Sequence, residues 1–175
     1  MPDNYPWYTL INEDMVLQGD ILEFFDILVP IEAEVDENNT INSKIEQYNV
    51  IVMSQSCDLE ASKIDFVLLC PVIDVDVFTE QASGAFKGRK GLEQIRRGVI
   101  PGLHMIAECN LDNCLRPIRI VNFHKIFSMP INYVKEIAQK NGDRIRLCPP
   151  YREHLAQSFA RYFMRVGLPI DIPKF

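Results

Sequence analysis

Short hydrophobic runs separated by polar turns divide this chain into segments of strand length. Runs of about four to eight β-branched, aromatic and aliphatic residues, bounded by Gly, Pro, Asn or Asp, are typical of β-strands. The run VIVM at 50–53 is apolar at every position, which indicates a strand buried on both faces. By this pattern we predict strands over residues 19–33, 46–54, 65–73, 103–108, 116–127 and 144–148.

Two segments near the C-terminus have a helical pattern instead. Pro130 and a later Asn-Gly pair suit the start and the end of a helix, which is therefore predicted over 131–140. The C-terminal segment 149–167 repeats apolar residues at helical spacing and predicts an amphipathic helix over 151–166.

The order of these elements predicts a mainly β, α+β fold. Most strands are joined by short loops, which favours antiparallel pairing, and five or six such strands with a closing helix are typical of a small barrel. The length of 175 residues predicts one domain over 1–175, with residues 76–98 as a basic, mobile insertion that is helical or irregular. Trp7 and Tyr8 are expected to form an aromatic arm that packs on the barrel or docks on a partner.

Composition narrows the class of protein. No apolar run approaches the ~20 residues that span a membrane, and the first residues, MPDNYPWYTL, lack the basic start and apolar core of a secretory signal. Five cysteines at irregular spacing indicate reduced thiols. We therefore expect a cytoplasmic protein with no membrane partner. The sequence has no Walker loop, dinucleotide fingerprint or Ser-His-Asp signature, so we expect no cofactor.

The net charge of −6 conceals a gradient along the chain. Residues 1–60 contain thirteen acidic residues and one basic residue, whereas residues 116–175 contain four acidic and eleven basic residues. Either the two parts pack together and neutralise each other, or basic elements bind an anionic partner such as a nucleic acid. In the second case the expected contacts come from the insertion and the last helix: Lys87, Arg89, Lys90, Arg96, Arg97, Arg161 and Arg165.

The segment SQSCDLE, residues 54–60, brings a thiol, hydroxyls, an amide and carboxylates together after the predicted central strand. Short Ser and Asp side chains often bond nearby backbone amides, so one interpretation is a hydrogen-bonded turn with Cys57 buried in it. The others are a binding site built by Ser54, Gln55 and Asp58, or a nucleophilic Cys57. A nucleophile would need a histidine base, and the chain offers His104, His124 and His154.

Arg152 stands in the first turn of the last predicted helix, where the helix dipole disfavours a cation. This placement indicates a specific carboxylate partner. Glu153 is the nearest one, but a buried pair with Asp58 would satisfy both residues, and we predict that pair. If the pair is buried, the Arg152→Ala substitution should cost about 3–5 kcal/mol of stability.

A zinc site is an alternative use of the cysteines, although we expect no metal. His104, Cys109 and Cys114 would supply three ligands and Cys57 a fourth. Structural zinc sites more often contain Cys pairs about two to four residues apart, so this spacing is loose. A hairpin turn is predicted between Cys109 and Cys114 and would bring their thiols close together.

The order and the residues of several segments also carry a family resemblance. They are Gly19-Asp20-Ile21 before the first long strand, VIVMS and FVLLCPV in the next two, VNFHKIFSMPINYVKEIA running from strand into helix, and a terminal helix ending RVGLP. This layout resembles the MazF/PemK family of toxins. The resemblance implies an SH3-like barrel, a homodimer and kinship with sequence-specific endoribonucleases. The segments SQSCDLE and PPYREHLAQSFARYFMRVGLP also resemble an uncharacterised group of bacterial proteins.

Two catalytic positions of that family do not carry over. Its arginine before the second strand would fall within KIEQYN at 44–49, which has no arginine. Its Ser or Thr after the third strand would fall within PVID at 71–74, which has no hydroxyl, and Asp74 and Asp76 would repel a phosphate backbone there.

We therefore expect a small module that binds a protein, a second copy of itself or a nucleic acid without the family's ribonuclease mechanism. The resemblance suggests a toxin–antitoxin or phage-defence setting. The alternative is an active endoribonuclease with a relocated site that uses Cys57, His104, His124 or Arg116.

Overall fold

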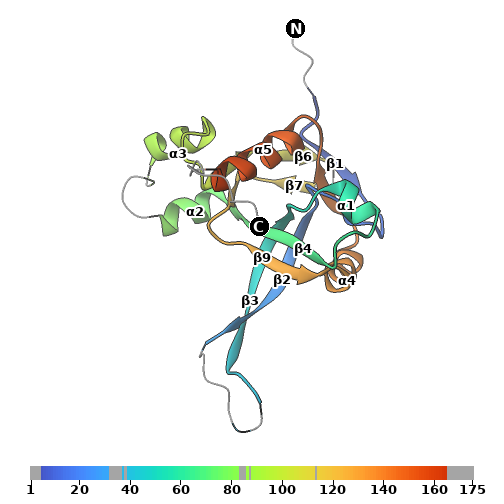
Figure 1. The fold of residues 1–175 in the computed structure, drawn as a ribbon. Coiled ribbons are helices and arrows are strands. Elements are labelled where there is room, and N and C mark those ends of the chain that lie inside the picture. The colour runs from blue at the N-terminus through green and yellow to red at the C-terminus, as the bar shows by residue number, and fades with distance from the viewer. Residues whose placement is uncertain are drawn as a thin grey trace, which may run out of the picture.

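A computed structural model describes residues 5–31, 37, 39–82, 86, 88–112 and 114–164 of the chain. Its main sheet has the strand order β2-β3-β4-β8-β5, and β9 also pairs with β4 (Figure 1). Two further pairs are β1 with β10 and β6 with β7, and every pairing is antiparallel. The bounds are β1 Tyr8–Ile11, β2 Ile21–Pro30, β3 Ser43–Val52, β4 Phe66–Asp74, β5 Leu103–Ile106, β6 Cys109–Leu111, β7 Cys114–Arg116, β8 Arg119–Asn122, β9 Phe127–Pro130 and β10 Arg144–Leu147.

Helices pack against several parts of the sheet. The helix α4 (Ile131–Asn141) packs on β2, β4 and β9, whereas α2 (Val75–Gln81) and α3 (Arg89–Arg96) lie beside β4, β8 and β5 (Figure 1). A short helix, α1 (Ser56–Glu60), follows β3, and α5 (Tyr151–Phe163) ends the described chain.

The predicted fold class is confirmed at the coarse level. The molecule is α+β with antiparallel sheets, and the long strands and the helices α4 and α5 form where the sequence predicts them. The described strands form no closed barrel, since β5 and β2 lie at opposite ends of the main sheet. The described part of the insertion 76–98 contains α3 and all but the first residue of α2.

Trp7 and Tyr8 pack on the body, the first of the two alternatives expected for them: Trp7 stacks on Tyr151 with ring centroids 3.6 Å apart, and Tyr8 is buried in β1, which pairs with β10 through Tyr8↔Leu147. One prediction about elements was wrong. The predicted strand 116–127 is divided among β7, β8 and β9. Pro117 and the turn at His124-Lys125 fall at these breaks, and Pro cannot donate a hydrogen bond to a sheet. Within the predicted hydrogen-bonded turn, residues 56–60 form the single helical turn α1.

The main sheet separates two hydrophobic clusters, as alternating side chains of a strand require. Val50 and Val52 face the cluster under α4, whereas Ile51 faces the larger cluster that includes Phe123 and Leu155 of α5. A third, smaller cluster joins α3 to β5 and β8. In the part of the chain that the structure describes, no helix is both long and apolar enough to cross a membrane.

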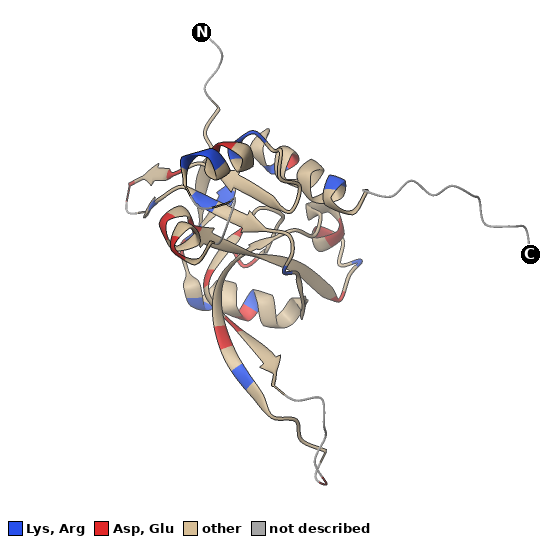
Figure 2. Cartoon of the chain, turned by 90° about the vertical axis from the view of Figure 1, so that its left-hand side faces the viewer, with Lys and Arg blue, Asp and Glu red and all other residues tan. Residues whose placement is uncertain are grey.

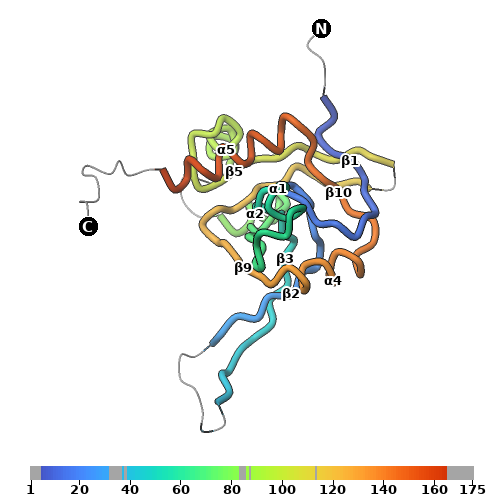
Figure 3. Tube along the Cα trace, turned by 45° about the vertical axis from the view of Figure 1, so that its right-hand side comes forward, coloured from blue at the N-terminus to red at the C-terminus, as the bar shows by residue number. Residues whose placement is uncertain are grey.

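The distal half of the β2–β3 pair projects out of the body as a two-stranded ribbon (Figures 1 and 3). Leu28 and Ile45 lie opposite each other on it and are 65% and 69% exposed. At its base, the register of β2 shifts between Leu22 and Phe25, so Glu23 and Phe24 form a bulge opposite the single residue Asn49.

Part of the charge gradient is neutralised within the fold, as the first of its two interpretations predicts. Acidic residues of the N-terminal part pair with basic residues of the C-terminal part, so both signs occur across the body (Figure 2). The pairs are Asp20 with Arg144 and Arg146, Glu23 with Arg116 and Arg119, Glu13 with Arg146, and Glu46 with Lys125.

Candidate functional sites

The SQSCDLE segment forms a corner stabilised by side-chain bonds to the backbone. Ser54 is buried, and its Oγ accepts a hydrogen bond from the Leu68 amide at 2.9 Å. Ser56 Oγ accepts one from the Gln18 amide at 3.2 Å, and Gln18 Nε2 donates to the Met53 carbonyl at 2.9 Å. These bonds join β3, β4 and the chain before β2, as expected of a hydrogen-bonded turn.

A groove runs between this corner and α5. Ser54, Gln55 and Asp58 line it, as the binding hypothesis predicts, and Asp58 is the only charged residue among the described residues of its lining. The remaining lining is mostly apolar: Gln18, Met53, Ile64, Phe66, Leu68, Ala156, Phe159 and Ala160. Phe66 is 56% exposed, so the groove presents aromatic surface to solvent. The groove thus joins the predicted corner to a part of α5 that the sequence analysis had not connected with it.

Two expectations about this corner were wrong. Cys57 is exposed, because residues 56–60 form a helical turn whose only buried member is Leu59. Asp58 does not pair with Arg152; its nearest basic group is Lys63 Nζ at 3.7 Å. Arg152 pairs with its neighbour Glu153 at 2.7 Å. The large cost expected of Arg152→Ala does not apply, since half-exposed pairs contribute about 0–1 kcal/mol.

A second site surrounds the bulge in β2. The sheet leaves the two backbone N–H groups of the bulge unpaired, and an Asn side chain accepts a hydrogen bond from each. The Glu23 N–H donates to Asn141 Oδ1 and the Phe24 N–H to Asn49 Oδ1, both at 3.1 Å. Phe24 has a φ of 55°, in the left-handed region, and its side chain is 66% exposed. Non-glycine residues in this conformation are costly and concentrate at functional sites.

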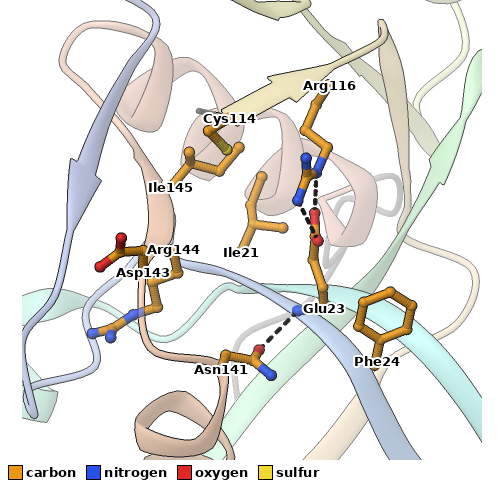
Figure 4. Close-up of a pocket in the computed structure, with 9 residues that line it drawn as sticks. All are labelled: Ile21, Glu23, Phe24, Cys114, Arg116, Asn141, Asp143, Arg144 and Ile145. Carbon is orange, nitrogen blue, oxygen red and sulfur yellow. Dashed lines mark hydrogen bonds and ion pairs between the residues drawn. The ribbon is translucent and has the colours of Figure 1, made fainter. Parts of the chain in front are cut away.

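Phe24 stands at the rim of a cavity of about 170 Å³ (Figure 4). Apolar side chains from β2, β7 and β10 line part of it, namely Ile21, Cys114 and Ile145. Arg116 and Asp143 lie on opposite sides of the cavity (Figure 4).

Glu23 connects this cavity to a buried charge. Its carboxylate accepts two hydrogen bonds from Arg116, at 2.5 and 2.6 Å, and lies 3.4 Å from Arg119 Nη1. Burial opposes ionisation, but the hydrogen bonds and charges of the two arginines hold the pKa of Glu23 below its usual value. Arg119 is 1% exposed, and its Nε and Nη2 have no hydrogen-bond partner among the described residues. Glu23 is therefore the counter-charge on which Arg119 depends.

The candidate catalytic residues do not form one site. His104 stacks on Phe123, and burial, followed by the charge of His154, lowers the pKa of His104 to about 4. His124 is exposed, with Nδ1 3.1 Å from Asn122 Oδ1. Its ring packs on Gly102, where a Cβ would lie 2.1 Å from it. In the described part of the chain, no hydrogen bond or ion pair joins any two of the four candidates Cys57, His104, His124 and Arg116.

The metal hypothesis gains no support. Cys109 and Cys114 do flank the β6–β7 hairpin, and both thiols are buried and reduced. Burial raises the pKa of the Cys114 thiol. Among the described residues, no three His, Cys, Asp or Glu side chains are placed to hold a metal.

The basic residues of the insertion lie on the exposed side of α3. Arg89, Lys90, Arg96 and Arg97 are exposed, and Arg96 pairs with Glu93 at 2.7 Å. Arg161 is also exposed, on α5. The remaining two predicted contacts, Lys87 and Arg165, lie outside the described residues.

Phe24, Glu23 and their two Asn partners were missed by the sequence analysis. A signal was present in ILEFFDILV, where two adjacent Phe residues interrupt the alternation of buried and exposed positions. Such an interruption is typical of a bulge.

No family model matches the chain, and neither does any curated protein.

Proposed function

We propose that this chain is a small binding module, similar in layout to the SH3-like barrel toxins of the MazF/PemK family, that binds a partner without their ribonuclease mechanism. A protein is the partner we favour, self-association is compatible with it, and the setting that the resemblance suggests is toxin–antitoxin or phage defence. Nucleic acid is the less favoured partner.

The groove between the SQSCDLE corner and α5 carries this proposal. Three residues proposed for binding from the sequence, Ser54, Gln55 and Asp58, line it together with apolar side chains. A groove with one carboxylate and no cation among its described lining residues has nothing to attract a phosphate. Apolar side chains of a protein, flanked by hydrogen-bonding groups, suit it better.

The relocated endoribonuclease is the second candidate, and one observation favours it. Asn122 and Gly102 fix the ring of an exposed His124, as the orientation of a general base requires. Against it, the Arg116 guanidinium is occupied by Glu23, and burial keeps His104 neutral at pH 7. A cleavage site at His124 would therefore need a cation from elsewhere.

Capture from a lysate of cells that carry the gene, followed by titration of the purified partner, tests the groove. Phe66→Asp should weaken binding by at least about tenfold, because a carboxylate buried without a partner costs more than the 1.4 kcal/mol that tenfold represents. Val99→Asp is the matched control, since Val99 is 57% exposed and is not among the residues that line the groove. A partner bound equally well by wild type and Phe66→Asp would refute the groove.

A further inference from the structure

The groove beside α5 has an exposed apolar surface that extends to the end of this helix. Phe66 and Leu68 line the groove and are 56% and 38% exposed. On the other side of the groove, Phe159 meets Phe163 edge-on, with ring centroids 5.2 Å apart, and Phe163 is 60% exposed. Phe163 is the last residue of α5. The apolar surface therefore leads from the groove to the point where the chain leaves the helix.

Residues 168–174, LPIDIPK, follow α5 closely and lie outside the described residues; we call them the tail segment. Pro169 and Pro173 disfavour a helix, and the residue before each proline is biased towards an extended backbone. Alternate side chains of an extended chain share one side. That side of the tail segment carries three apolar residues and then one cation: Leu168, Ile170, Ile172 and Lys174.

The groove offers the complementary chemistry. Its lining is mostly apolar, with Asp58 as the one charged residue among the described lining residues. The side-chain contacts of Asp58, with Lys63 Nζ at 3.7 Å and with the Cys57 thiol at 3.8 Å, both involve Oδ1. Within the described chain, Oδ2 has no such contact and is open to a further cation. Lys174 would supply that cation beside the apolar side chains of the tail segment.

We infer that the tail segment of the same chain occupies this groove in an extended conformation, and that a partner binds by displacing it. Ala160, which lines the groove, lies in the last turn of α5, so the tail segment begins close by. A short tether gives an effective concentration of about a millimolar, so even a weak contact is populated. The inference rests on the proposed binding function and adds the chemistry of the partner: an extended segment with alternating apolar side chains and a cation.

A nitroxide spin label on the native Cys57 of the purified full chain tests this contact by NMR. Cys57 is exposed and adjoins Asp58 of the groove, so the label broadens the signals of a segment held there. In wild type, the amide signals of the tail segment should lose most of their intensity. Ile170→Asp should restore most of it, because burying a carboxylate without a partner is costly. Asp171→Asn, on the opposite side of the segment, is the matched control and should leave the loss unchanged.

Titration of the partner gives a separate reading. Ile170→Asp should strengthen partner binding, by about tenfold for a groove that is open about a tenth of the time, whereas Phe66→Asp weakens it. Unchanged partner affinity in Ile170→Asp overturns the displacement. A wild type without broadening, or with the same broadening as Ile170→Asp, overturns the tail contact and leaves partner binding at the groove to its own test. Broadening that Ile170→Asp removes, together with a partner that Phe66→Asp does not weaken, supports the tail contact and refutes the proposed binding function instead.

Discussion

Arg144 and Asp20 form a buried ion pair between β10 and the chain at the start of β2, with Nε 3.0 Å from Oδ2. The Arg146 guanidinium binds the same carboxylate, and Asp20 is fully buried. The remaining donors of Arg144 bind the carbonyls of Glu13 and Met15 at 2.8 and 2.7 Å. One carboxylate therefore joins the two-stranded β1–β10 sheet to the main sheet.

Asp20→Asn should destabilise the protein by about 3–5 kcal/mol, because it leaves the buried Arg144 without its counter-charge and leaves Arg146 with only the exposed Glu13. Chemical denaturation measures this loss. The matched control is Asp143→Asn, an exposed carboxylate with one neutral hydrogen-bond partner, which should cost less than about 1 kcal/mol. Equal losses in the two variants would show that Asp20 does not have this structural role.

Glu23→Gln should destabilise the fold by about 3 kcal/mol at neutral pH, since Arg119 would lose its counter-charge. The pKa of Glu23 is lower in the folded state than in the unfolded chain, where it is near 4.5. The contribution of Glu23 to the stability of the fold is therefore present above pH 4.5 and is lost as the pH falls through the lower, folded pKa. Wild type should therefore lose more stability than Glu23→Gln on acidification below pH 4.5. Glu93→Gln, which removes an exposed pair with Arg96, should cost less than about 1 kcal/mol.

His104 should make the fold sensitive to mild acid. Its folded pKa of about 4 lies below the ordinary value of 6.5, so between these values the unfolded chain binds a proton that the folded chain does not. Stability is then full above about pH 6.5 and falls towards pH 4, by up to about 1.4 kcal/mol per pH unit. Denaturation at several pH values should show a shallower fall for His104→Gln, and an unchanged fall would exclude His104 as its source. His154→Gln is the control and should retain most of the fall.

Cys57 should be the fastest thiol to react with an aromatic disulfide reagent in the folded protein. It is exposed, whereas Cys70, Cys109 and Cys114 are buried, and burial raises the pKa of Cys70 to about 12. Cys57→Ser should abolish the fast phase and leave the slower Cys148 reaction. A fast phase that survives this substitution would mean that another thiol is accessible.

The long elements of this fold can be predicted from the sequence, because their apolar patterns and their terminal residues indicate the same type of element. The strands β3 and β4 follow from apolar runs, and α4 follows from Pro130 at its start and Gly142 at its end. The strand β1 is not predictable in this way, because its four residues pair with β10 more than 130 residues later. The helix α1 is a single turn rich in residues that equally favour turns.

Only one side of the groove could be predicted from the sequence. Ser54, Gln55 and Asp58 are conspicuous in the sequence, but only the tertiary structure places Ala156 and Phe159 opposite them. The Asp58–Arg152 pair failed because both residues have a nearer partner, Lys63 and Glu153. The Phe24 site depends on two Asn side chains from distant elements, a relation that no local pattern contains.

Incubation of the purified protein with mixed RNA, with and without a chelator, tests most directly the claim that the chain binds without cleaving. We expect no discrete cleavage products, since Arg116 is engaged by Glu23 and the candidate catalytic side chains are not joined into one site. His124→Ala and His104→Ala are the informative variants. Reproducible cleavage by wild type that either variant removes would contradict the account and establish the relocated endoribonuclease instead.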